Sequence, residues 1–131
     1  MPKTKLAVLL LGHGSQAASA NEAMHRVEAD LRGRHPGWIV ESAFLEINRP
    51  SIPEGIGLCA GRGAGRIVLL PYFLHLGNHV GKDLPRLMLE GQIRHPEVEI
   101  ILGPHLGYHP KLAEIVQERL DEALEGVPAR A

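Results

Sequence analysis

A chain of 131 residues, 44% of them hydrophobic, has the size and composition of one globular domain, which we expect to cover residues 1–131. Its 14 Lys and Arg residues nearly balance its 15 Asp and Glu residues, so no general electrostatic attraction to nucleic acid is expected. The single cysteine, Cys59, excludes an internal disulfide, a cysteine-rich zinc site and a cysteine-ligated iron–sulfur cluster within one chain.

The first apolar run, at residues 6–11, predicts a buried strand. No apolar run approaches the roughly 20 residues that a membrane-spanning helix needs. The N-terminal run also leads straight into a glycine turn and lacks the small-residue cleavage site of a signal peptide. We therefore expect no membrane association and a cytoplasmic location.

Three further strands are predicted, at residues 39–45, 67–73 and 98–102. Continuous Val, Ile and Leu, as in IVLLPYF, favours strands that are covered on both faces. Helical patterns occupy residues 20–32 and 84–91, a glycine-rich and weaker stretch at 51–63, and a last segment that begins at about Pro110. Strands alternating with helices predict an α/β domain, a four-stranded, mainly parallel sheet with helices on both faces.

Two loops of this predicted fold carry histidines. The loop after the first strand contains GHGS, with His13, and the loop after the third strand contains HLGNHVGKD, with His79. In a parallel sheet these loops open at the same carboxyl edge, where ligands bind. Glu46, at the end of the second strand, is the natural carboxylate partner, although a surface charge or a helix-start contact would explain it equally well. Two histidines converging on one cleft favour a functional role.

Four other histidines have sufficient structural interpretations. His35 and His95 each sit in an Arg-His-Pro sequence at a predicted helix end, where a cation is favourable. His25 lies among polar neighbours on a helix and is expected to be solvated. His109 precedes Pro110 at the start of the last helix.

The segment from Gly12 to Ala17 is compatible with several chemistries. It formally matches the dinucleotide fingerprint G-x-G-x-x-A, but that fingerprint expects an acidic residue about 20 positions on, whereas Glu46 lies 32 beyond Gly14. A P-loop needs Lys-Ser/Thr after the glycines, and a hydrolase elbow needs G-x-S-x-G. Metal binding fits better, because neutral imidazole suits cobalt, nickel, iron and zinc. A nucleotide-binding oxidoreductase stays open as an alternative.

Taken together, three motifs resemble a known family. LLLGHGS near the N-terminus, FLEINRPSI after the second strand and RIVLLPYFLHLGNHVGKDLP around the third resemble the sirohydrochlorin chelatases, class II chelatases of the cobaltochelatase and ferrochelatase type. The resemblance covers essentially the whole chain, includes LGPHLGYHPKLAEIV, and points to the small, single-domain form. It implies a chelatase-like fold and a lyase that inserts a divalent metal ion into sirohydrochlorin during cobalamin- or siroheme-type tetrapyrrole (porphyrin) biosynthesis.

By the same resemblance, His13 and His79 are the catalytic and metal-binding histidines, and Glu46 is the acidic residue of the active site. Ser15, Asn78 and Gly14 are expected to bind the carboxylate-rich substrate. The metal is a substrate, expected to be cobalt with iron or nickel as alternatives, and no organic cofactor is implied. Whether His75, which departs from the family pattern, and His105 contribute to the site is left open.

One four-stranded domain offers a shallow cleft for so large a macrocycle, and larger relatives contain two such units. We therefore expect a homodimer, with clefts that face a shared cavity. The partners expected are sirohydrochlorin and a divalent metal ion, without nucleic acid or membrane. The alternative to an enzyme is a non-catalytic metal or tetrapyrrole carrier.

Overall fold

A computed structural model describes residues 5–127, and the first and last four residues of the predicted domain lie outside the described part. The sheet has four parallel strands in the order β2-β1-β3-β4. The strands are β1 (Lys5–Gly12), β2 (Ile39–Phe44), β3 (Ala64–Pro71) and β4 (Glu99–Leu102). The helices are the short 3-10 helix η1 (Ala18–Asn21), α1 (Glu22–Arg34), α2 (Ile52–Gly61), α3 (Asn78–Arg94) and α4 (Pro110–Glu125). The predicted α/β fold with a four-stranded parallel sheet is confirmed.

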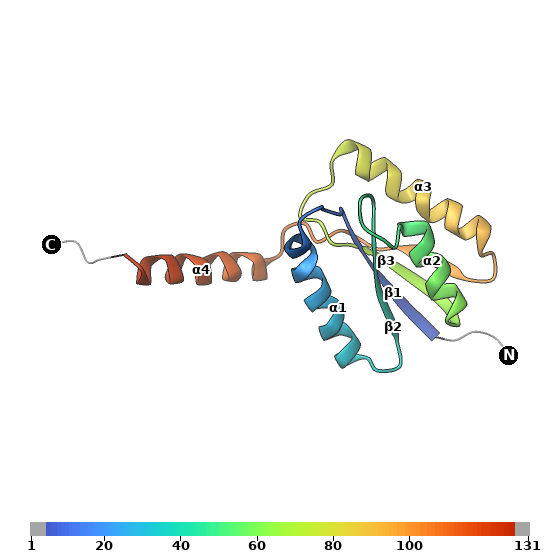
Figure 1. The fold of residues 1–131 in the computed structure, drawn as a ribbon, viewed down its shortest axis with the longest axis horizontal. Coiled ribbons are helices and arrows are strands. Elements are labelled where there is room, and N and C mark those ends of the chain that lie inside the picture. Colours follow the sequence, from blue (N-terminus) through green and yellow to red (C-terminus); the bar gives the residue numbers. More distant parts are fainter. Residues whose placement is uncertain (1–4, 128–131) are drawn as a thin grey trace.

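Helices cover the two faces of the sheet unequally (Figure 1). Alternate side chains of β1 point to opposite faces. Leu9 and Leu11 belong to the larger core, which α2 and α3 cover, whereas Val8 and Leu10 belong to the smaller core beneath α1. The fourth helix, α4, extends away from the sheet in Figure 1, and none of its residues is buried.

Close helix packing on the larger core depends on glycine. A Cβ atom at Gly55 of α2 would lie 2.8 Å from the Cβ of Ala43, and one at Gly91 of α3 would lie 2.8 Å from Cδ1 of Ile56. The helix backbones therefore approach their neighbours more closely than any larger residue would permit. This packing explains why the glycine-rich segment at 51–63 forms a helix, although glycine disfavours helices.

The start of α2 is held by a capping box. The Ser51 side chain accepts from the Glu54 amide, and the Glu54 carboxylate accepts from the Ser51 amide. Arg49, which precedes the cis peptide bond to Pro50, pairs with the same carboxylate. The hydrogen bond from Arg49 is the largest of the causes that lower the pKa of Glu54 to about 2. The connection from β2 to α2 is thereby fixed beside the functional edge of the sheet.

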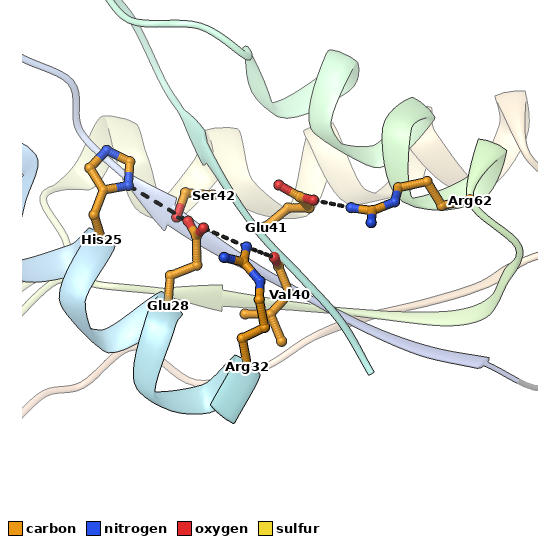
Figure 2. Close-up of polar contacts among 7 residues, drawn as sticks. All are labelled: His25, Glu28, Arg32, Val40, Glu41, Ser42 and Arg62. Carbon is orange, nitrogen blue, oxygen red and sulfur yellow. Dashed lines mark hydrogen bonds and ion pairs between the residues drawn. The ribbon is translucent and has the colours of Figure 1, made fainter. Parts of the chain in front are cut away.

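The outer strand β2 is covered by polar contacts from α1, which Figure 2 shows. Arg32 donates to the carbonyl oxygen of Val40 and pairs with Glu28 at 2.7 Å. Ser42, the one polar side chain that is buried in the described part, donates to the same carboxylate of Glu28. Bonding a carbonyl of an outer strand to a charged side chain makes that strand a poorer template for another chain.

The buried thiol of Cys59 gives a direct test of the packing of α2. The residue is fully buried, and its burial is the main cause that raises the pKa of the thiol to about 12. Because the thiolate is the reactive form, we expect native protein to react with a disulfide reagent at pH 8 about 10³-fold or more slowly than unfolded protein does. Absorbance of the released thiol would measure both rates, and equal rates would contradict the packing described.

No helix within residues 5–127 is both long and apolar enough to cross a membrane.

Candidate functional site

Backbone hydrogen bonds extend the sheet past the ends of its strands and bring two predicted site residues together. Beyond β1 and β2, the amide of Leu45 donates to the carbonyl of Gly12 at 3.0 Å, and the amide of Glu46 donates to the carbonyl of His13 at 3.2 Å. Because the strands are parallel and in register, their carboxyl ends meet at one edge. The sequence alone placed these residues at that edge, and the structure places them side by side.

The side chains of His13 and Glu46 point toward one another. Nε2 of His13 lies 3.3 Å from Oε1 of Glu46, and both side chains are about 60% exposed, at 60% and 61% respectively. The imidazole also meets the ring of Phe73 edge-on, with 6.1 Å between centroids. Phe73 therefore limits the positions that the His13 ring can adopt, a role that the sequence analysis missed. The result is an oriented nitrogen and an oxygen that are both accessible to a ligand.

Gly14 is required by the close approach of the two loops. It has a φ of 101°, and a Cβ atom there would lie only 1.9 Å from the carbonyl oxygen of Glu46. On the other side of this contact, Ile47 has a φ of 67°. A backbone in this region is unfavourable for a β-branched residue and persists only where the surroundings hold it. The histidine sits between glycines because one of them lets the Glu46 loop come this close.

Hydrogen bonds to the Asn48 side chain also hold these two loops together. Its Oδ1 accepts from the amide of Ser15 at 2.6 Å and from Nδ2 of Asn21 at 3.1 Å. Asn48 thus links the segment after β2 to the turn that leads into α1. Sequence reasoning missed this positioning residue, although it lies only two positions after Glu46 and belongs to a residue type that often bonds to loop backbone.

A cavity of about 310 Å³ opens beside His13. It is lined by Gly12, His13, Gly14, Ser15, Ala20, Asn21, Met24, Tyr72 and Phe73. The lining combines backbone of the GHGS turn with two aromatic rings, so it offers both polar and flat apolar surface. Two other predicted site residues, Gly14 and Ser15, belong to this wall. The hydroxyl of Ser15 also accepts from the amide of Ala17 at 3.1 Å.

His79 and Asn78 lie in the first turn of α3 and not in a loop, which corrects the helix start predicted at residue 84. Gly81 and Pro85 lower the helix propensity of the first part of α3. Val80 and Leu84 nevertheless pack against the larger core and stabilise the helix there. Both site residues are exposed at the carboxyl edge of the sheet. The N-cap residue of this turn is Gly77, which has no side chain that could accept from the first backbone N–H groups of the helix.

Within residues 5–127, no group of three or more His, Cys, Asp or Glu side chains stands ready to hold a metal ion. The close pair consists of His13 and Glu46, whereas His79 lies on a different element, α3. His75 is exposed, and His105 is half-buried in the segment before α4.

The remaining histidines have structural surroundings. His35 and His95 end α1 and α3, as predicted, and the His35 ring stacks on Trp38 with 3.6 Å between centroids. Nδ1 of His109 accepts from the amide of Lys111 and so caps α4. These residues need no ligand to explain them.

The sequence is similar to those of several proteins that are named as chelatases. A sirohydrochlorin cobaltochelatase of Priestia megaterium is 35% identical over 125 residues, which are 95% of this chain and 40% of that protein. A sirohydrochlorin cobaltochelatase of Methanococcoides burtonii is 30% identical, and the match covers 92% of this chain and 98% of the relative. A chloroplastic sirohydrochlorin ferrochelatase of Arabidopsis thaliana is 28% identical over 95% of this chain and 55% of its own length. The chain thus spans less than half of the Priestia relative.

The fold is also similar to a solved structure, the sirohydrochlorin chelatase SirB of Bacillus subtilis subspecies spizizenii in complex with cobalt. The TM-score is 0.78 at 27% identity, and the match covers 91% of this chain and 51% of SirB. A sequence profile of the family CbiX matches residues 7–123, which is nearly the whole chain. With the parallel sheet and the paired loops at its carboxyl edge, this match shows that the chain belongs to the CbiX family.

Proposed function

We propose that this protein is a sirohydrochlorin metal chelatase, a lyase that inserts a divalent metal ion into the macrocycle, with cobalt as the expected metal and iron or nickel as alternatives. The observation that carries the proposal is the pairing of His13 with Glu46 beside an open cavity at the carboxyl edge of the sheet. Family membership and the cobaltochelatase and ferrochelatase names of the relatives support the choice of reaction.

The spacing of the pair suits a single metal ion. Imidazole nitrogen and carboxylate oxygen ligands lie about 2.1 Å from a divalent transition metal. Two such ligands at a tetrahedral angle are then about 3.4 Å apart, close to the 3.3 Å between Nε2 of His13 and Oε1 of Glu46. We propose that His79 supplies a further nitrogen from α3. A sphere that water completes can release its ion, whereas a closed structural site cannot.

The same pair can accept protons from the substrate. Metallation replaces two pyrrole N–H protons by one divalent ion, so a base must lie near the macrocycle. The imidazole of His13, which lines the cavity, and the neighbouring carboxylate of Glu46 are both exposed and can serve as this base. The same two side chains would then release the metal ion to the macrocycle and accept the protons that the ion displaces.

Substrate carboxylates require donors at the rim of the cavity. We propose that the backbone amide of Gly14 and the hydroxyl of Ser15 are donors at this rim, since the Ser15 amide already donates to Asn48. We also propose that Asn78 offers the uncapped first turn of α3, where the helix dipole favours anions. Arg86, a further cation of α3, is held by Glu90 at 2.9 Å and by Asp83 at 3.5 Å. Recognition is therefore local, in keeping with a net charge of −1.

The remaining parts of the proposal concern the setting of the reaction. The metal is consumed as a substrate, so no organic cofactor is required. The expected location is the cytoplasm, the partners are sirohydrochlorin and the metal ion, and neither nucleic acid nor a membrane takes part. Two copies are proposed to pair, because a single domain presents a shallow site to a large ligand.

An anaerobic assay of the purified protein with sirohydrochlorin and cobalt, iron or nickel, each supplied separately, tests the activity. We expect the absorbance change of metal insertion to be faster than in protein-free controls for at least one metal, with turnover beyond one equivalent. Stoichiometric binding of metal or macrocycle without acceleration would identify a carrier and overturn the proposal. Binding of NAD(P) with no acceleration would favour a nucleotide-binding oxidoreductase.

A further inference from the structure

Three consecutive residues after β2 lie against three consecutive residues after β1. The amide of Glu46 donates to the carbonyl of His13 at 3.2 Å. The carbonyl oxygen of Glu46 lies so close to Gly14 that a Cβ atom there would be only 1.9 Å away. Oδ1 of Asn48 accepts from the amide of Ser15 at 2.6 Å. The position of the Glu46 backbone relative to His13 therefore depends on the conformation of the segment that ends at Asn48.

This segment reverses direction at Ile47. The amide of Asn48 donates to the carbonyl of Glu46 at 2.7 Å, and Ile47 between them has a φ of 67°. A hydrogen bond between residues two positions apart around a positive φ forms a γ-turn of the rare, strained kind. The Ile47 side chain is 58% exposed, so its burial contributes little to the turn. A β-branched residue keeps such a backbone only where neighbouring contacts hold it.

The Asn48 side chain supplies these contacts. Its Oδ1 accepts from the amide of Ser15 and, at 3.1 Å, from Nδ2 of Asn21, and both donors follow β1 in the chain. The side chain is half-buried and lines a cavity of about 240 Å³ between α1 and β2, not the cavity beside His13. Asn48 therefore acts on the candidate site through the backbone.

The backbone matters here because little else fixes the metal-binding pair. Nε2 of His13 and Oε1 of Glu46 are 3.3 Å apart, and both side chains are exposed. Within residues 5–127, neither side chain makes another hydrogen bond or ion pair, and the edge of the Phe73 ring is a further contact of His13. An exposed polar contact contributes little stability by itself. The spacing of the pair is set mainly by the two backbones beneath it.

We propose that Asn48 is a positioning residue for metal insertion. By accepting from two donors beyond β1, its Oδ1 holds the γ-turn at Ile47 and keeps the Glu46 backbone against the GHGS turn. When these hydrogen bonds are lost, Ile47 relaxes to an ordinary backbone conformation, and Glu46 moves away from His13. The two side chains then no longer reach one ion. This inference rests on the proposed function, because it takes His13 and Glu46 as metal ligands.

Two variants of Asn48 separate the acceptor from the size of the side chain. Asn48→Leu has a similar shape but leaves the Ser15 amide without its acceptor, whereas Asn48→Asp keeps an oxygen that can accept from both donors. We expect Asn48→Leu to bind Co²⁺, without macrocycle, about 10-fold or more weakly than wild type, the factor that loss of one or two hydrogen bonds produces. Asn48→Asp should bind Co²⁺ at least as tightly as wild type. Titration followed by the visible absorbance of Co²⁺ measures these affinities.

Two further measurements locate the effect. The metallation rate of Asn48→Leu at saturating sirohydrochlorin should fall with its Co²⁺ affinity, while the KM for sirohydrochlorin stays near the wild-type value, because Asn48 does not line the cavity beside His13. By NMR, the amides of Ser15 and Glu46 should exchange with solvent faster in Asn48→Leu and at the wild-type rate in Asn48→Asp, because exchange reports local opening.

Gln92→Leu is the matched control. Gln92 is also a side-chain amide that bridges backbone groups: it donates to the carbonyl of Val98 at 2.6 Å and accepts from the amide of Ile100 at 3.0 Å. These contacts join the last part of α3 to the start of β4, at the opposite edge of the sheet from His13. We expect Gln92→Leu to lose at least as much thermal stability as Asn48→Leu, with unchanged Co²⁺ affinity.

The outcomes separate the positioning role from the activity itself. Wild-type Co²⁺ affinity and metallation rate in folded Asn48→Leu would overturn the inference, and so would weak Co²⁺ binding by Asn48→Asp or an equal loss of affinity in Gln92→Leu. If Asn48→Leu does not fold, Asn48→Ala is held to the same criteria. A wild type that shows these differences in Co²⁺ binding but does not accelerate metallation would contradict the proposed function and still support the role of Asn48.

Discussion

Replacing His13 with alanine is expected to lower the rate of metal insertion by about 10²–10⁴-fold, the range that loss of one positioned acid–base group produces. The variant loses the nitrogen that lies 3.3 Å from Oε1 of Glu46. It therefore loses one of the two proposed metal ligands and one of the proposed proton acceptors. Stability should change little, because the side chain is 60% exposed and its described contacts are with the exposed Glu46 side chain and the edge of the Phe73 ring. Rates of metallation and thermal unfolding would be measured side by side.

His25→Gln is the matched control for this variant. His25 is also about half exposed and also lies near a glutamate, with Nδ1 3.6 Å from Glu28, but it belongs to α1 and does not line the cavity. We expect its rate to stay within about twofold of the wild type. His79→Ala should resemble His13→Ala if α3 supplies the further nitrogen. Near-normal turnover of both His13→Ala and His79→Ala would remove the proposed mechanism.

Much of the fold follows from the strand pattern. Buried parallel strands are continuous apolar runs, and the run at 6–11 lies within β1 as predicted. The limits of the third strand differ from the predicted ones. The third strand begins at Ala64 and not at residue 67, because Arg66 is paired in register with Glu99 of β4 although it is charged. A charged residue near the end of a strand does not contribute to the apolar run from which the strand was predicted, so the prediction began too late.

The site was predictable only in part, for a related reason. Parallel topology alone puts His13 and Glu46 at one edge, but their contact depends on backbone details that periodicity does not encode. These are the positive φ angles of Gly14 and Ile47. The last helix was predicted from its apolar spacing, yet nothing in one sequence says that α4 would have no buried residue.

The second large effect is expected at Gly14. Replacement by alanine puts a Cβ atom 1.9 Å from the carbonyl oxygen of Glu46, in a backbone with φ of 101° that L side chains rarely adopt. Because the contact is with backbone, no side-chain rotation relieves it. We expect a loss of about 2 kcal/mol or more of unfolding free energy, and a melting temperature lower by roughly 5–10 °C.

The activity of Gly14→Ala should fall with its stability. Separating the two loops breaks the hydrogen bond from the Glu46 amide to the His13 carbonyl and increases the distance between the His13 nitrogen and the Glu46 carboxylate. Gly33→Ala is the matched control: it lies in α1, a Cβ atom there meets nothing within 4 Å, and alanine favours a helix by up to about 1 kcal/mol. The same substitution should therefore change the melting temperature in opposite directions at the two glycines. If Gly14→Ala kept wild-type stability and full metallation rate, the close approach of the loops would not be what holds His13 and Glu46 together.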